Sequence, residues 1–231
     1  MLGSVITGRA QLILNDTSGI RWPVANLIDW LNEGQKATVR LAPEANCVSA
    51  YVQLVEGPRQ DLTALCATAG TRVPMRLIDV TRNVTDATGL PALRAIRIVN
   101  RRALDQYDPD WPSATAVSLV QHYMFDSRNP KEFFVYPPQP AVTPGYVEVV
   151  YSAEPTDLAN GTESIDLDDS YAAMLVDYVV HRALSADAEY GANPQRIAQH
   201  YNQFLAGVQS KSQQDLTVEP VPGDQVVEGR E

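Results

Sequence analysis

The sequence predicts an α+β fold in which helices at both chain ends flank a strand-rich middle, followed by an extended C-terminal tail. Apolar residues recur at helical spacing over residues 4–41 and again over 168–214. Between residues 46 and 155 the pattern changes to short apolar segments separated by turns, which is typical of an antiparallel sheet or a small sandwich. After Leu216 neither period continues, and proline and glycine become frequent.

Two helices are expected ahead of the strands. The first covers residues 4–15 and ends at a run of turn-forming residues. The second opens at Trp22-Pro23, because a proline in the first helical turn lacks only an N–H group that would be unbonded anyway. Pro43 places its end near Leu41, since the residue before a proline is disfavoured in helical geometry. Its amphipathic stripe consists of Val24, Leu27, Ile28 and Leu31.

The middle of the chain contains six strand candidates and one short helix. Residues 48–54 alternate between apolar and polar side chains and run into the Glu56-Gly57-Pro58 turn. The other strands are expected at Met75–Val84, Ala95–Val99, Ser118–Phe125, Glu132–Tyr136 and Tyr146–Ser152. The short helix is expected at Asn100–Tyr107.

The last third predicts an antiparallel helical hairpin. Asp168 can cap a helix over residues 169–189, because its carboxylate can accept from free N–H groups in the first turn. Asn193-Pro194 then reads as cap and first-turn proline of a final helix that runs to about residue 214. The connector of residues 190–192 is short enough to make the two helices neighbours.

Composition argues against several classes of protein. The 231 residues contain 28 acidic and 18 basic side chains, for a net charge of −10. A DNA-wrapping protein or a protein of anionic membrane surfaces needs a cationic face, so neither is expected. No apolar run is long enough to span a membrane, and residues 1–5 lack the start of a signal peptide.

The search for chemistry finds no catalytic motif. Phosphate-binding loops, nucleotide-binding glycine motifs, nucleophile elbows and zinc-protease motifs are absent from the sequence. Cys47 and Cys66 are expected to be free thiols. Asp177 and His181 could share a helix face, but two ligands do not make a metal site. The acidic cluster 166–169 is interpreted as helix capping, with cation binding as the alternative. No enzyme activity, metal or cofactor is expected.

Three groups of residues are candidates for contacts with partners. The densest positive stretch is either solvated or meets an acidic neighbouring surface: Arg94, Arg97, Arg101 and Arg102. The aromatic residues are either core anchors or interface residues, and the candidate anchors are Trp22, Trp30, Tyr136, Tyr201 and Phe204. The acidic tail is either free or docks on a partner through its aliphatic residues: Leu216, Val218, Val221, Val226 and Val227.

Five segments, taken in order, carry a resemblance to a known family. They are Arg21–Gln35 (RWPVANLIDWLNEGQ), Phe133–Pro138 (FFVYPP), Val147–Ser152 (VEVVYS), Asp187–Ala192 (DAEYGA) and His200–Leu205 (HYNQFL). Their order and spacing resemble the tailed-bacteriophage head–tail adaptor, or connector, proteins, including the branch related to the podovirus tail tubular protein A. The resemblance covers about residues 4–210 and leaves the acidic tail without a counterpart.

The resemblance implies an architecture and a role. The helices of both chain ends, residues 1–42 and 165–214, would form one helical bundle, with a β-rich insertion over 43–164 and a tail over 215–231. The protein would be a structural virion protein without enzyme activity. About twelve copies would assemble as a ring beneath the portal protein, extend the DNA channel without sequence-specific binding, and provide the platform for the tail nozzle or tube.

Within such a role we expect particular contacts of the candidate residues, and two alternatives stay open. The aliphatic tail residues would bind the portal, and Trp111 with the four arginines would lie at the subunit interface. Part of the surplus acid would line the channel, where it repels the DNA backbone. The protein would occupy the virion neck after assembly in the host cytoplasm, with no membrane partner. The alternatives are another nozzle or tail-completion component, and a cytoplasmic enzyme with a site between sheet and helices.

Overall fold

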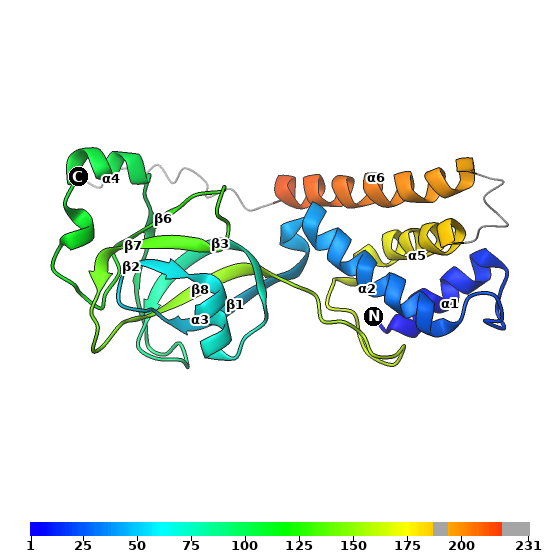
Figure 1. The fold of residues 1–231 in the computed structure, drawn as a ribbon, viewed down its shortest axis with the longest axis horizontal. Helices are drawn as coiled ribbons and strands as arrows, with labels where there is room; N and C mark the ends of the chain where they lie inside the picture. The colour runs from blue at the N-terminus through cyan, green and yellow to red at the C-terminus, as the bar shows by residue number, and fades with distance from the viewer. Residues whose placement is uncertain (187–193, 219–231) are drawn as a thin grey trace, which may run out of the picture. The chain divides into compact units, whose positions relative to one another are not determined.

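The computed structural model describes residues 1–186 and 194–218, without the side chains of Leu216 and Val218. The chain divides into two compact units. The helical unit contains Met1–Ala42 and the chain from Leu158 onward, and the β unit contains Pro43–Asp157. The fold is therefore α+β, with the helices drawn from both ends of the chain and the strands from its middle (Figure 1).

Four α-helices lie among the described residues of the helical unit, and α5 packs most extensively against the other three. They are α1 (Gly3–Leu14), α2 (Val24–Leu41), α5 (Ala172–Ala186) and α6 (Pro194–Val218). The amphipathic stripe of α2 faces this core, with Leu27, Ile28 and Leu31 buried, whereas Val24 at its edge is exposed.

The start of α2 is fixed by hydrogen bonds that the sequence pattern only suggested. The Asp16 carboxylate accepts from the backbone N–H groups of Ile20, Arg21 and Trp22 at 3.1, 2.9 and 2.8 Å. These bonds favour the charged carboxylate, so the pKa of Asp16 is lowered. Trp22 Nε1 donates to the backbone oxygen of Ala183 at 3.2 Å, which ties the entrance of α2 to the end of α5.

The α5–α6 hairpin packs through aromatic side chains. Phe204 is 1% exposed and meets the Tyr178 ring edge-on, with ring centroids 5.0 Å apart. α6 continues to Val218, beyond the end expected near residue 214. The extra turn contains an i,i+4 ion pair, in which Lys211 Nζ donates to Asp215 Oδ1 at 2.6 Å. The expected connector 190–192 and the end of the helix at 189 lie outside the described residues.

Residues 158–164 lie in the helical unit, whereas the sequence grouped them with the strands. The N–H of Gly3 donates to Glu163 O at 2.9 Å, and the Asn32 side chain pairs with both backbone groups of Leu158. These bonds use backbone groups and amides rather than apolar side chains, so the apolar pattern carried no signal for them.

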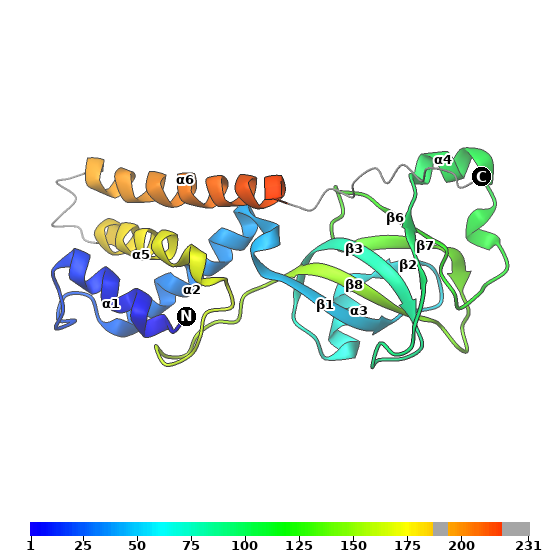
Figure 2. The ribbon, with the colours of Figure 1, turned by 180° about the vertical axis from the view of Figure 1, so that it is seen from behind.

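The β unit consists of two four-stranded sheets. The first has the order β1-β8-β3-β4, and its strands are β1 (Cys47–Gln53), β8 (Tyr146–Ala153), β3 (Pro74–Val84) and β4 (Ala92–Ala95). The second has the order β2-β7-β6-β5, and its strands are β2 (Gly57–Asp61), β7 (Glu132–Gln139), β6 (His122–Phe125) and β5 (Arg97–Ile98). All pairs are antiparallel except β5–β6, which is parallel. Figure 2 shows the unit from behind.

The core of the β unit forms between the two sheets and one helix. Alternate residues of β8, among them Val147, Val149 and Tyr151, are fully buried in one cluster with Phe133 and Val135 of β7. Helix α3 (Leu62–Ala69) packs against β1, β2 and β3. A second short helix, α4 (Arg101–Tyr107), has no buried residue.

One of the expected strands is interrupted and another begins later than the sequence pattern predicts. Ile96 interrupts the strand expected at Ala95–Val99, because the chain changes sheets there. The N–H of Ile96 bonds to Thr81 O in the first sheet, and the next N–H, of Arg97, bonds to Gln121 O beside the second. The strand expected at Ser118–Phe125 covers only His122–Phe125, and the backbone of Val120 bonds to the Asn83 side chain instead of to a neighbouring strand.

β2 and α3 occupy residues that the sequence pattern left as a turn and a connector. Gln60 holds the start of β2 in place. Its buried side-chain amide accepts from the N–H of Val55 and donates to Val55 O, both at 2.8 Å, as a backbone partner in a strand would. Asp61 caps the start of α3, because its carboxylate accepts from the N–H of Thr63 at 2.8 Å.

Candidate interaction surfaces

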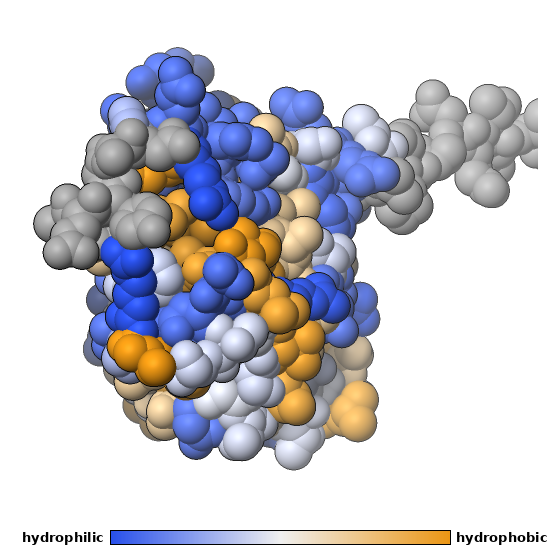
Figure 3. Space-filling view, turned by 90° about the vertical axis from the view of Figure 1, so that its right-hand side faces the viewer, coloured by the Kyte–Doolittle hydropathy of each residue, from blue (hydrophilic) through white to orange (hydrophobic). Residues whose placement is uncertain are grey.

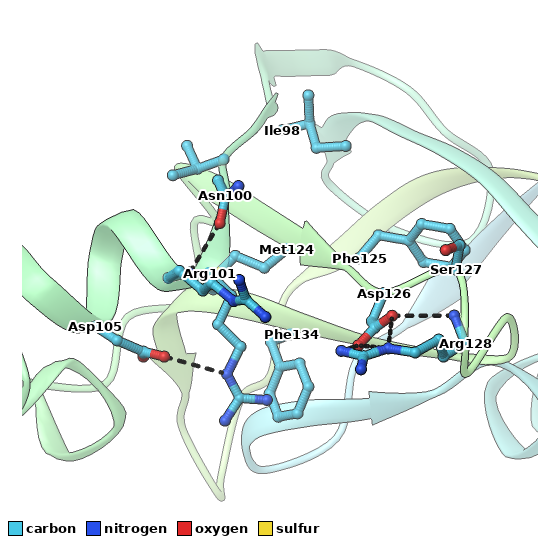
Figure 4. Close-up of a pocket in the computed structure, with 12 residues that line it drawn as sticks. Ile98, Asn100, Arg101, Asp105, Met124, Phe125, Asp126, Ser127, Arg128 and Phe134 are labelled. Atoms are coloured by element: carbon cyan, nitrogen blue, oxygen red, sulfur yellow. Dashed lines mark hydrogen bonds and ion pairs between the residues drawn. The ribbon is translucent and has the colours of Figure 1, made fainter.

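A groove of about 780 Å³ lies on the β unit and collects several of the candidate residues. We call it the arginine groove. Its walls are the N-terminal half of α4, the end of β6 with residues 125–128, and Phe134 of β7. Ile98, just before α4, and the side chains of Arg101, Arg102 and Arg128 complete it (Figure 4).

Aromatic packing and hydrogen bonds hold one wall of the arginine groove in place. The Arg101 guanidinium carbon lies 4.3 Å from the centroid of the Phe134 ring, a cation–π contact. Trp111 meets the same ring edge-on with centroids 6.3 Å apart, and its Nε1 donates to Asp105 Oδ1 at 2.7 Å. Asp105 Oδ2 in turn lies 3.7 Å from Arg101 Nε. Asn100 caps α4 by accepting from the N–H of Arg102 at 2.9 Å.

The opposite wall carries a charged fork. Arg128 donates to both carboxylate oxygens of Asp126, with Nη2 2.8 Å from Oδ2 and Nε 3.1 Å from Oδ1. These bonds from Arg128 lower the pKa of Asp126 to about 2, with a smaller contribution from the charge of Arg102. The charges of Arg128 and Asp126 largely cancel each other. The positive charge of the arginine groove therefore comes chiefly from Arg101 and Arg102 of α4.

The structure separates the four clustered arginines into two pairs. All four are exposed. Arg101 and Arg102 line the arginine groove, whereas Arg94 on β4 and Arg97 on β5 act on His122. Burial of that imidazole and the two nearby positive charges lower its pKa. Trp111 is 1% exposed, so it supports the arginine groove from inside the β unit and does not present its ring to a neighbour.

One exposed aromatic residue, Tyr107, was not among the candidate residues of the sequence. Tyr107, at the C-terminal end of α4, is 90% exposed. Asp108 follows it directly, and Asp110 is two residues further on. The sequence placed Tyr107 at the end of a short helix without a role. The only signal was the motif Tyr-Asp-Pro-Asp, in which an aromatic residue stands among acids after a helix too short to bury it.

The helical unit also exposes apolar side chains, and Figure 3 shows them gathered in a band on one of its faces. Exposed large apolar residues occur at the end of α1 and in the loop that follows, at Leu12, Ile13 and Ile20. Tyr201 on α6 is 40% exposed and packs against His181 in a tilted arrangement with ring centroids 4.9 Å apart.

The five candidate anchors differ in how deeply they are buried. Trp22 and Phe204 are buried, Trp30 and Tyr136 are half-buried, and Tyr201 is exposed on one side. In the tail, Leu216 and Val218 fall within the last turn of α6. Their side chains, and all of Val221, Val226 and Val227, lie outside the described residues.

The polar clusters noted in the sequence serve structural bonds. Asp168 accepts from the N–H of Ser170 at 2.9 Å and so caps the 3₁₀ turn at Asp169–Tyr171 that leads into α5. Asp177 pairs with His200 Nδ1 at 2.8 Å and not with His181, whose Nδ1 faces the backbone oxygen of Ile197 at 3.1 Å. Cys47 and Cys66 are both free thiols.

The described part of the chain contains neither a metal-binding cluster nor a membrane-spanning helix. Over residues 1–186 and 194–218, no three His, Cys, Asp or Glu side chains are grouped so as to hold a metal ion. Among the helices described there, none is both long and apolar enough to cross a membrane.

A known protein family matches the chain. The chain matches the family model described as SU10 adaptor protein over residues 2–224, which includes both the helical unit and the β unit. No curated protein matches the chain. Because the match spans nearly the whole chain, the protein belongs to the SU10 adaptor protein family and is a phage adaptor, a structural component of the virion.

Proposed function

We propose that the protein forms a ring beneath the portal of a phage capsid, extends the DNA channel and carries the tail nozzle or tube. The observation that carries this proposal is the family match over residues 2–224, which includes both the helical unit and the β unit. Adaptors of this kind act through their surfaces. The surfaces described above are the arginine groove, the segment Tyr107–Asp110 and the apolar band of the helical unit.

Ring formation is supported by the kind of surfaces present. A closed cyclic ring uses heterologous contacts, in which one patch of each copy meets a different patch of the next. The β unit offers unlike patches, because the arginine groove at the N-terminal half of α4 differs in chemistry from the exposed Tyr107 at its C-terminal end. We propose that Arg94, Arg97, Arg101 and Arg102 belong to the subunit interface, with Trp111 as internal support.

We further propose two roles for the acidic part of the chain. The tail residues Leu216, Val218, Val221, Val226 and Val227 provide apolar material that can bind the portal. Part of the net charge of −10 faces the channel, where it repels the phosphate backbone and lets DNA pass without binding. The protein assembles in the host cytoplasm and ends in the virion neck.

The experiment that tests the proposal mixes the purified full-length protein with the portal ring from the same genome and weighs the product by native mass spectrometry. We expect a stable complex with one adaptor copy per portal subunit. A folded protein that leaves an intact portal ring unbound would overturn portal docking and would favour a more distal nozzle component.

The tail is tested in the same assay by a matched pair of variants. The first replaces Val221, Val226 and Val227 by serine, which removes apolar side chains and keeps every charge. The second replaces Gln225 by serine as a control. We expect only the triple variant to weaken portal binding, and equal binding of both would contradict a docking role for the tail valines.

A further inference from the structure

The arginine groove has the chemistry to hold an aromatic side chain that carries acidic neighbours. Its apolar surface comes from Phe134 and from Ile98, which is 64% exposed. Within the described residues, Arg102 forms no ion pair closer than 4.0 Å, although its charge acts on Asp126. An occupant that combines a flat apolar group with carboxylates would cover the apolar wall and give the Arg102 guanidinium a partner.

The chain itself carries such a group at the other end of the same helix. Tyr107 is 90% exposed at the C-terminal end of α4, and Asp108 and Asp110 follow it. The turn is held in shape, because the N–H of Asp108 bonds to Leu104 O at 2.8 Å and that of Trp111 bonds to Asp108 O at 3.2 Å. We call Tyr107 with Asp108 and Asp110 the tyrosine knob.

A copy cannot place its tyrosine knob in its own arginine groove. The two features lie at opposite ends of α4, whose seven residues measure roughly 10 Å in length. The arginine groove is lined by the N-terminal half of α4 (Figure 4), and its lining residues do not include Tyr107, Asp108 or Asp110. A tyrosine knob that occupies this groove would therefore belong to a second copy.

We propose that the tyrosine knob of one subunit occupies the arginine groove of the next subunit. The Tyr107 ring packs on Ile98 and Phe134, and the carboxylates of Asp108 and Asp110 face Arg102 and its neighbours. This contact is heterologous, since each copy offers a knob on one side and a groove on the other, and such a contact propagates around a ring. The inference rests on the proposed ring and supplies the pair of surfaces that sets its direction.

Complementary knockouts provide the test. Tyr107→Ala removes the knob, and Arg102→Glu reverses the charge of the groove. Both side chains are exposed, so neither change disturbs a core. Tyr107→Phe keeps the ring and serves as the conservative variant, and Arg76→Glu makes the same charge change at an exposed position of β3 outside the groove. Self-association of the full-length protein is measured by sedimentation equilibrium, and loading on portal rings is measured by native mass.

We expect Tyr107→Ala and Arg102→Glu each to weaken self-association by about tenfold or more, as central interface residues do. Tyr107→Phe and Arg76→Glu should resemble the unchanged protein. The decisive sample is the mixture of Tyr107→Ala and Arg102→Glu. Tyr107→Ala keeps an intact groove and Arg102→Glu keeps an intact knob. The mixture should therefore form pairs more tightly than either variant alone and should assemble no further.

The result that overturns the inference is distinct from failure of the proposed function. Normal self-association and normal portal loading of both variants would exclude the knob-in-groove contact while leaving the adaptor role intact. A mixture that assembles no further than each variant alone would also exclude it. An unchanged protein that binds no portal but self-associates through Tyr107 would support the contact and remove portal docking. An unchanged protein with no self-association in solution or on the portal would overturn the contact.

Discussion

Asn83 on β3 forms reciprocal hydrogen bonds with the backbone of Val120, which precedes β6. Asn83 Nδ2 donates to Val120 O and the N–H of Val120 donates to Asn83 Oδ1, both at 2.8 Å. Nδ2 also donates to Arg94 O at 3.0 Å. β3 belongs to the first sheet and β6 to the second, so this side chain, only 1% exposed, joins the two sheets of the β unit.

Replacing Asn83 by alanine should therefore destabilise the β unit strongly. The change leaves three backbone groups without their partner, and each unsatisfied buried group costs about 1–3 kcal/mol. We expect the free energy of unfolding to fall by about 3 kcal/mol, measured by urea denaturation. Asn202→Ala, on the exposed face of α6, is the control and should stay within about 0.5 kcal/mol. Equal effects of the two changes would contradict the role given to Asn83.

The sequence predicted those elements whose formation depends on apolar side chains. α2 was expected at Trp22-Pro23 to Leu41 because Leu27, Ile28 and Leu31 form its buried stripe. β2 and the sheet change at Ile96 were not expected, since they depend on the Gln60 amide and on single backbone bonds. A buried polar side chain looks like a surface residue in a pattern of apolar positions.

The candidate surface was predictable only in part, for a similar reason. The clustering of Arg101 and Arg102 identified one wall of the arginine groove. Phe134 and Arg128 come from a distant strand and loop, and only the pairing of β6 with β7 brings them to α4. The sequence did not indicate whether Tyr107 is exposed or buried, because its exposure depends on what α4 packs against.

A glycine beside β8 should be intolerant of any side chain. A β-carbon at Gly145 would lie 2.0 Å from Ser118 O, which is a backbone atom and cannot rotate away. We expect Gly145→Ala to lower the free energy of unfolding by more than about 2 kcal/mol. Gly8→Ala, within α1 and with nothing within 4 Å of its β-carbon, should instead stabilise the protein by about 0.5–1 kcal/mol. Urea titrations of both variants check the opposite signs.

The Asp126–Arg128 fork gives an acid-side prediction. The pKa of Asp126 is lowered from 3.8 to about 2, chiefly by the side-chain bonds from Arg128. Any stability from this carboxylate is therefore fully present above pH 3.8 and is lost as pH falls through about 2. Arg128→Gln should move the pKa of Asp126 back towards 3.8, followed by NMR titration of its carboxyl carbon. Arg102→Gln should move it less, and the reverse order would contradict the assignment.

Tyr123 gives the corresponding prediction on the alkaline side. Burial of its phenol, with the bond from Tyr123 Oη to Asp79 Oδ1 at 2.7 Å, raises its pKa above 10.0. Above pH 10 the unfolded chain loses this proton and the folded chain keeps it, so stability falls as pH rises. Tyr123→Phe should reduce that slope by up to about 1.4 kcal/mol per pH unit. Urea titrations between pH 9 and 11 measure the slope, and an unchanged slope would exclude Tyr123 as its source.

Two aromatic residues of α6 provide a matched test of what holds the helical hairpin together. Phe204 is 1% exposed and packs edge-on against Tyr178, whereas Tyr201 is 40% exposed and packs against the tilted ring of His181. Phe204→Ala leaves a cavity in the contact of α6 with α5 and should lower the free energy of unfolding by about 3–5 kcal/mol. Tyr201→Ala removes a ring that water already reaches, so the loss should be about 1 kcal/mol. Far-UV circular dichroism during urea titration follows both variants. Similar losses would mean that the hairpin is held by the exposed ring as much as by the buried ring.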